Sequence, residues 1–106
     1  MEGAKSDAKN NLAACMYEMI GTALIMYAFM VEGGTYYPLA TTLAMMMAAW
    51  NISGGHFNPA ITLSQYIAKM RLAKDLIPTV LIIVSQFLGG FLGILLGYFA
   101  LISSSY

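Results

Sequence analysis

Long uncharged stretches alternate with short polar stretches along this chain. Residues 13–31 carry no charge except that of Glu18, and residues 76–102 carry none. A helix needs about 20 apolar residues to cross a hydrocarbon core of about 30 Å, and both stretches are long enough. The pattern therefore predicts membrane-spanning helices at 13–31 and 76–102.

A third span is predicted between these two. Residues 36–52 are also uncharged, but this stretch is shorter than the other two. The span therefore needs a few flanking residues at each end to cross the core. Tyr36 and Tyr37 stand at its start, where an interfacial aromatic belt would lie. The Glu32-Gly33-Gly34 run just before it predicts a turn between the first two spans.

A short helix is predicted to begin at Asn58. Asparagine is a preferred N-cap residue, and Pro59 has the fixed φ that suits a first helical turn. At about 1.5 Å per residue, residues 59–68 rise about 15 Å, which is half of the hydrocarbon core. We therefore expect an all-α membrane protein with three transmembrane helices and one re-entrant half-helix, the loop and half-helix covering 53–70.

The rest of the chain divides simply. Residues 1–11 are polar and are expected to form a disordered N-terminal arm, residues 12–102 the helical unit, and residues 103–106 a short tail.

Composition narrows the class of protein. Hydrophobic residues make up 59% of the chain, charged residues only 9%, and the mean hydropathy is +0.71, which excludes an ordinary soluble domain of this size. The net charge is zero, which removes the case for a nucleic-acid partner. No nucleophile, base and orienting group occur together, so we do not expect an enzyme or a cofactor. His56 has no ligand partner at metal spacing and is expected to pack, not to bind a metal.

The segment from Ser53 to Phe57 suggests water inside the membrane. Its glycines and serine predict irregular backbone, whose unpaired groups are costly against lipid but tolerated along a water-filled cavity. Asn58 would stand at the positive end of the half-helix dipole. Carbonyl acceptors, an amide donor and a positive field can together replace the hydrogen bonds of a water molecule and oppose the passage of cations.

Two further features predict packing inside the bundle. Glu18 is a carboxylate within a predicted span, so it should face the interior with a partner such as loop N–H groups; the alternative is a neutral acid bonded to a neighbouring helix. Gly89, Gly93 and Gly97 recur every four residues and predict a helix-packing face, although glycine is common in membrane helices in general.

The stretch SGGHFNPAIT resembles the first signature loop of the aquaporin (major intrinsic protein) family, in which an Asn-Pro-Ala tripeptide caps a re-entrant half-helix. YEMIGT at 17–22 and QFLGG at 86–90 also resemble the family's first-helix and third-helix patterns, so the resemblance covers nearly all of 12–102. It implies that Glu18 braces the loop. It also implies a pore lining made of Gly54, Gly55, His56, Phe57, Asn58, Pro59 and Ala60.

Within that family the fold has two inverted repeats, and the resemblance here is to the first repeat only. We therefore expect an aquaporin-like half-channel for water or small neutral solutes, which needs a complementary second half to form a pore. The alternative is a non-conducting structural subunit of a larger membrane complex. Under either hypothesis the chain lies in the lipid bilayer, and its protein partners would be that complementary half or other membrane subunits.

Charge predicts the orientation in the membrane. Lys5 and Lys9 precede the first span, and Lys69, Arg71 and Lys74 lie between the second and third, so all five basic residues fall on one side. The positive-inside rule then puts the N-terminus and the half-helix loop of this integral membrane protein on the cytosolic or an equivalent positive-inside face, whichever membrane holds it. So strong a bias argues against an antiparallel homodimer.

Overall fold

The computed structural model describes residues 2–70 and 72–104 of the chain. These residues form helices α1 (Glu2–Glu32), α2 (Tyr36–Ala49), α3 (Pro59–Lys69) and α4 (Leu72–Ser104), and none of them lies in a strand. The predicted all-helical class is therefore confirmed.

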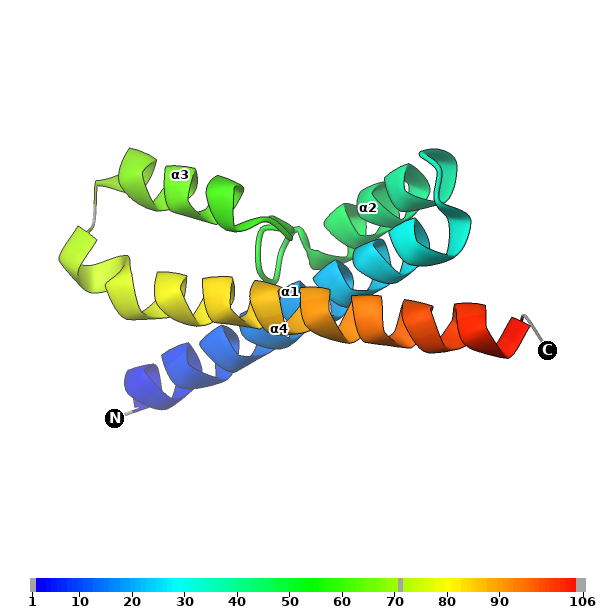
Figure 1. Ribbon diagram of the computed structural model, residues 1–106. Coiled ribbons are helices and arrows are strands. Elements are labelled where there is room, and N and C mark those ends of the chain that lie inside the picture. The colour runs from blue at the N-terminus through cyan, green and yellow to red at the C-terminus, as the bar shows by residue number, and fades with distance from the viewer. Residues whose placement is uncertain (1, 71, 105–106) are drawn as a thin grey trace.

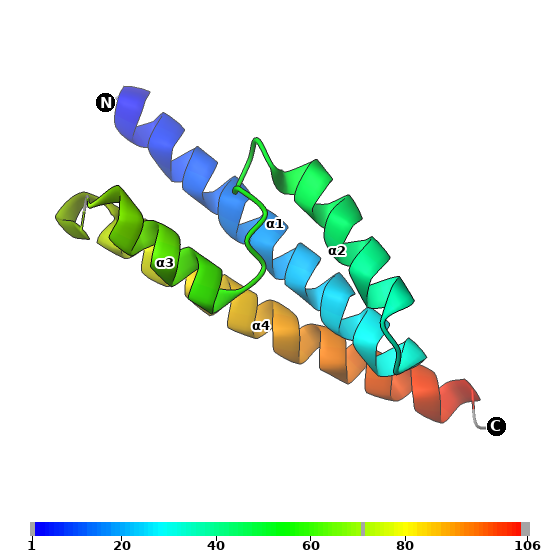
Figure 2. The same cartoon turned by 90° about the horizontal axis from the view of Figure 1, so that it is seen from above.

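The two long helices, α1 and α4, cross each other, and the two short helices lie on one side of the crossing (Figure 1). Helix α2 packs against α1, and α3 packs against α4. The N-terminus and the α3–α4 turn lie at one end of the molecule, while the α1–α2 turn and the C-terminus lie at the other (Figures 1 and 2). Between α2 and α3 the chain runs back along α1 before α3 begins (Figure 2).

Glycines set the distance between α1 and α4. A methyl group at Gly89 would overlap the carbonyl oxygen of Met19, and one at Gly93 would overlap that of Ala23. A methyl group at Gly97 would instead overlap the side chain of Met30. The glycines predicted to form a packing face are thus buried at the helix crossing, where a missing side chain lets the two backbones approach closely.

Local signals explain where the short helix begins and ends. The side chain of Asn58 accepts a hydrogen bond from the backbone N–H of Ala60 at 2.8 Å, and Pro59 occupies the first turn. At the other end Met70 adopts a left-handed conformation, with φ 53°, and its N–H donates to the carbonyl of Ile67. The helix predicted over 59–68 is therefore observed with an end one residue later.

Two helices in the described part of the chain are long and apolar enough to cross a membrane, Ala8–Glu32 within α1 and Leu72–Ser104. Helix α2 has 14 residues instead of the 17 expected over 36–52. It ends early because the carbonyl of Ala49 accepts the N–H groups of Ile52, Ser53 and Gly54, which closes the helix into a turn. At about 1.5 Å per residue it rises about 21 Å, less than the hydrocarbon core.

The N-terminal arm also differs from the expectation. Residues 2–11 are not disordered but continue α1 as helix. Alanine, lysine and glutamate in this segment are good helix formers, and extending an existing helix avoids the cost of nucleation. At the other end α4 includes Ser103 and Ser104, while Arg71 and the last two residues of the tail lie outside the described residues.

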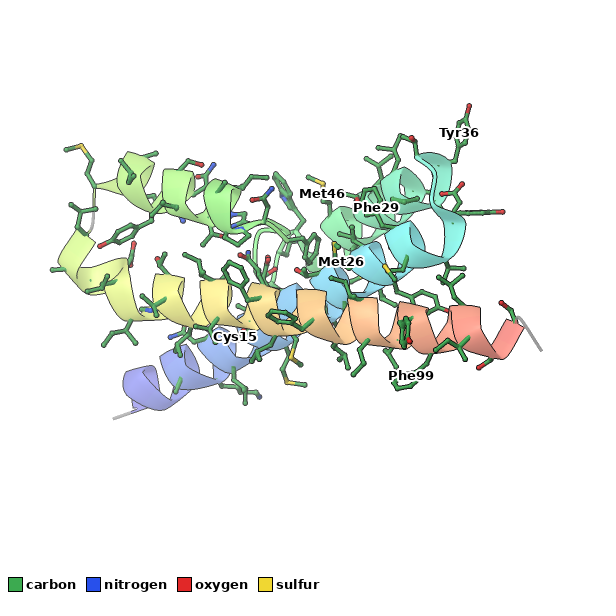
Figure 3. All side chains as sticks on the ribbon, viewed as in Figure 1. Cys15, Met26, Phe29, Tyr36, Met46 and Phe99 are labelled. Atoms are coloured by element: carbon green, nitrogen blue, oxygen red, sulfur yellow. The ribbon has the colours of Figure 1, made fainter. Side chains whose placement is uncertain are left out.

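Several polar side chains are buried inside this fold, while most of the large apolar side chains are exposed. The buried polar residues are Glu18, Thr22, Thr62 and Gln86, whereas most of the large hydrophobic residues of α1 and α4 are exposed. Tyr36, at the start of α2, points away from the bundle (Figure 3). An apolar exterior around a polar interior is the arrangement that a lipid environment favours.

The helix crossing gives a first prediction. Gly93→Ala forces a methyl group against the carbonyl of Ala23, and overpacking of this kind costs about 1–3 kcal/mol. We expect the variant to unfold at a lower SDS fraction in mixed micelles, followed by far-UV circular dichroism. Gly90→Ala is the matched control, because a methyl group there meets only a Thr22 methyl at 3.9 Å. Equal unfolding midpoints for the two variants would contradict close packing at Gly93.

Candidate functional site

The site is organised around the carboxylate of Glu18, which is fully buried in the middle of α1. Its Oε1 accepts hydrogen bonds from the Ser53 hydroxyl at 2.8 Å and the His56 N–H at 2.9 Å. Its Oε2 accepts from the Phe57 N–H at 2.7 Å and the Gln86 amide at 2.9 Å. All four partners are N–H or O–H donors, so both oxygens of the Glu18 side chain act as acceptors.

These contacts fix the direction of the loop's peptide groups. The chain has no cis peptide bond among its described residues, and in a trans peptide the C=O points opposite to the N–H. The N–H groups of His56 and Phe57 point at Glu18. The carbonyls of Gly55 and His56, which belong to the same two peptide units, therefore point away from Glu18.

Phe57 anchors the loop to α1 a second time. Its ring is buried and lies over Gly21, where an added methyl group would overlap the ring. Gly21 stands three residues after Glu18 on the same side of α1, so one face of this helix contacts both the ring and the backbone N–H of Phe57. Phe57 has φ 52°, a left-handed value rare for a non-glycine residue, and the double anchor keeps it there.

A second layer of polar contacts ties the loop to α3 and α4. The Gln86 amide nitrogen donates to Thr62 Oγ1 at 2.8 Å as well as to Glu18. Thr62 Oγ1 also lies 3.0 Å from His56 Nδ1 and donates to the Asn58 carbonyl at 3.3 Å. Gln86 is 1% exposed and Thr62 is 4% exposed, so the hydrogen bonds that the Gln86 amide donates form away from solvent.

The N-terminal tip of α3 is more exposed to solvent than the polar contacts around Thr62 and Gln86. Asn58 is exposed, its side-chain oxygen is used by the Ala60 N–H, and its amide nitrogen donates to no described residue. The helix N-terminus behind it contributes a partial positive charge. The tip therefore presents a free neutral donor in a positive field.

Two of the cavities beside the loop are lined by several of the predicted pore residues. One of about 300 Å³ is lined on the loop side by Gly54, Gly55 and His56. The other, of about 360 Å³, borders Phe57, Asn58 and Pro59 at the tip of α3. The predicted pore residues from 54 to 59 thus meet at these two cavities, whereas Gly89, Gly93 and Gly97 lie apart, at the helix crossing. Ala60 borders neither cavity, and its backbone N–H forms the Asn58 cap.

Sequence reasoning missed several residues of this site. Ser53 and Thr62 were not assigned roles, and Gln86 was noted only within a family-like stretch. A buried glutamine in the middle of an otherwise apolar span was the available signal, because an amide there needs partners. The described residues contain no group of three His, Cys, Asp or Glu side chains that could hold a metal ion.

Comparison with known proteins points to one family of proteins. The family model described as Major intrinsic protein matches residues 35–105. Aquaporin Z of Brucella melitensis biotype 1 is 43% identical over 63 residues, which cover 55% of this chain and 28% of the relative. Aquaporin Z of Photorhabdus laumondii subsp. laumondii is 44% identical over 52 residues, which cover 49% of this chain and 21% of the relative.

The matched part of the chain thus spans between about a fifth and a little over a quarter of the length of these two relatives. No solved structure matches the chain.

The Glu18 contacts generate the second prediction. Glu18→Gln replaces one acceptor oxygen by a donor, which then faces N–H groups, and a buried unsatisfied group costs about 1–3 kcal/mol. We expect earlier unfolding in SDS and faster hydrogen exchange at the amides of His56 and Phe57.

Glu32→Gln is the matched control for this variant. The Glu32 carboxylate accepts from the Tyr37 N–H at 2.9 Å at an exposed helix start, so the same substitution there should cost less than about 1 kcal/mol. Unchanged exchange at His56 and Phe57 in Glu18→Gln would show that the carboxylate does not hold the loop.

Proposed function

The chain belongs to the major intrinsic protein family, whose members are helical membrane channels, and from this premise we propose that residues 53–60 form one half of a pore for water or small neutral solutes. The other half would be a complementary inverted repeat, in another chain or in sequence beyond these residues. Both relatives are named aquaporin Z, which favours water as the solute.

The observation that carries this proposal is the division of the loop's peptide groups. Their N–H groups are held by Glu18, and the carbonyls of Gly55 and His56 point the other way. Such carbonyls can accept hydrogen bonds from water molecules in single file, while the Asn58 amide donates at the α3 tip. Glu18 would then act as the brace that keeps this ladder in register.

The proposed membrane topology has three crossings and one re-entrant half-helix. Helices α1 and α4 cross fully, and α2 crosses with help from the residues that flank it. Helix α3 rises about 16 Å, so it reaches about half of the hydrocarbon core and returns the chain to the side from which the loop entered.

The basic residues support one orientation. Lys5 and Lys9 lie in the first turns of α1, and Lys69 and Lys74 flank the α3–α4 turn, at the same end of the molecule (Figures 1 and 2). The opposite end carries only Glu32 among its described charged residues. The positive-inside rule therefore favours a cytosolic N-terminus and loop.

The first experiment is to determine what accompanies the chain. The native particle that contains these residues is extracted in mild detergent and sized, and its polypeptides are identified by mass spectrometry. A second inverted half with its own half-helix, in the same polypeptide or a bound one, supports the half-channel. A large assembly without such a half would instead favour a non-conducting structural subunit.

The third prediction concerns Asn58 in that particle, reconstituted in liposomes. Asn58→Asp keeps a good helix cap, so the fold should persist, but it puts a negative charge at the α3 tip. We expect weaker exclusion of cations, measured as increased proton or sodium leak, together with altered water flux by stopped-flow light scattering.

Asn51→Asp is the matched control for Asn58→Asp. It adds the same charge at an exposed residue that borders a different cavity, together with Asn10 and Tyr17. Cation leak and water flux should stay at the level of the unmodified protein. If Asn58→Asp behaves like this control, Asn58 does not contact the permeating species.

A further inference from the structure

The cavity of about 300 Å³ beside the loop has a mixed lining. The loop contributes Gly54, Gly55 and His56. Met46 on α2, Trp50 just after it, and Ile61 and Gln65 on α3 complete the lining. We call this space the inner vestibule of the loop.

The α2 end of this vestibule is held rigidly. The fully buried Ala49 accepts three backbone hydrogen bonds through its carbonyl, from the N–H groups of Ile52, Ser53 and Gly54 at 2.9, 2.9 and 3.2 Å. Trp50 is the next residue and stands in the turn that these bonds close. Gly55, with φ 63°, packs against the backbone of Met46, and Figure 3 shows Met46 near this loop.

Trp50 itself is not covered by the rest of the chain. Its side chain is 66% exposed, and its indole N–H donates to no described residue. A large, rigid side chain on a fixed turn can narrow an opening without the entropy loss that a flexible side chain would incur. It is also the only tryptophan of the chain, which makes its surroundings measurable.

We propose that Trp50 is a specificity-determining residue that narrows the inner vestibule of the solute path and disfavours solutes wider than water, such as three-carbon polyols. This inference rests on the proposed function. The indole lines the same cavity as Gly54, Gly55 and His56, so a solute that reaches the loop from the α2 side would pass beside it. Replacing it by a small side chain widens the vestibule without touching Glu18, Asn58 or the loop backbone.

The first test measures where the indole lies. Fluorescence of the reconstituted native particle is compared with that of its Trp50→Phe variant, and the difference signal belongs to Trp50. We expect quenching by aqueous acrylamide and little quenching by phospholipids brominated on their acyl chains. Dominant quenching by the brominated lipids would make Trp50 an interfacial anchor facing lipid, as tryptophans often are, and would overturn the inference.

The second test measures solute selectivity in the same liposomes. Trp50→Ala should raise glycerol permeability relative to water permeability several-fold, while Trp50→Phe should stay close to the unmodified protein. Tyr36→Ala is the matched control, because Tyr36 is an exposed aromatic residue at the opposite end of α2 and points away from the bundle (Figure 3). An unchanged glycerol-to-water ratio in Trp50→Ala would overturn the role in selectivity.

The failures of the two proposals give different results. If the unmodified particle passes no water, the proposed function fails, and the role of Trp50 in solute choice fails with it, whatever the fluorescence reports. If the particle passes water but the indole is quenched from the lipid side or the ratio does not change, the channel stands and only the inference about Trp50 is wrong.

Discussion

The structure depends on one buried carboxylate. Glu18 lies in the middle of α1 and receives hydrogen bonds from a loop hydroxyl, two loop N–H groups and an amide on α4. A carboxylate in an apolar span is costly unless donors surround it, so the favourable state is the one in which the loop and α4 both reach it. The need to satisfy the two oxygens of one buried side chain thereby joins three segments far apart in sequence.

The helix crossing makes this meeting possible. Gln86 can donate to Glu18 because Gly89 and Gly93, one and two turns further along α4, let its backbone approach that of α1. Gly21 also has no side chain, which leaves room for the Phe57 ring. Close backbone approach and polar pairing therefore support each other, and disturbing either one should loosen the loop.

Sequence signals that span a few residues predicted much of this arrangement. Contacts between residues far apart in the chain were not predicted. The start of α3 followed from Asn58 and Pro59, and the packing face followed from the glycine spacing, because each signal lies within one helix or its cap. The predicted length of α2 was wrong, because the carbonyl of Ala49 closes a turn that the residue types in this segment do not predict. Thr62 was missed because its partner Gln86 is 24 residues away and neither interrupts its helix.

The Gln86 amide is oriented so that its oxygen stays without a hydrogen bond, which costs free energy of folding. Its oxygen is buried without a hydrogen-bond partner among the described residues, and so is the hydroxyl of Thr22. Rotating the amide would put that oxygen against the Glu18 carboxylate and remove the donor to Thr62 as well. One unsatisfied acceptor, at about 1–3 kcal/mol, costs less than breaking two bonds that include one to a buried charge. Position 86 therefore requires a side chain with two N–H donors on one neutral group, which glutamine supplies and an isosteric methionine or glutamate does not.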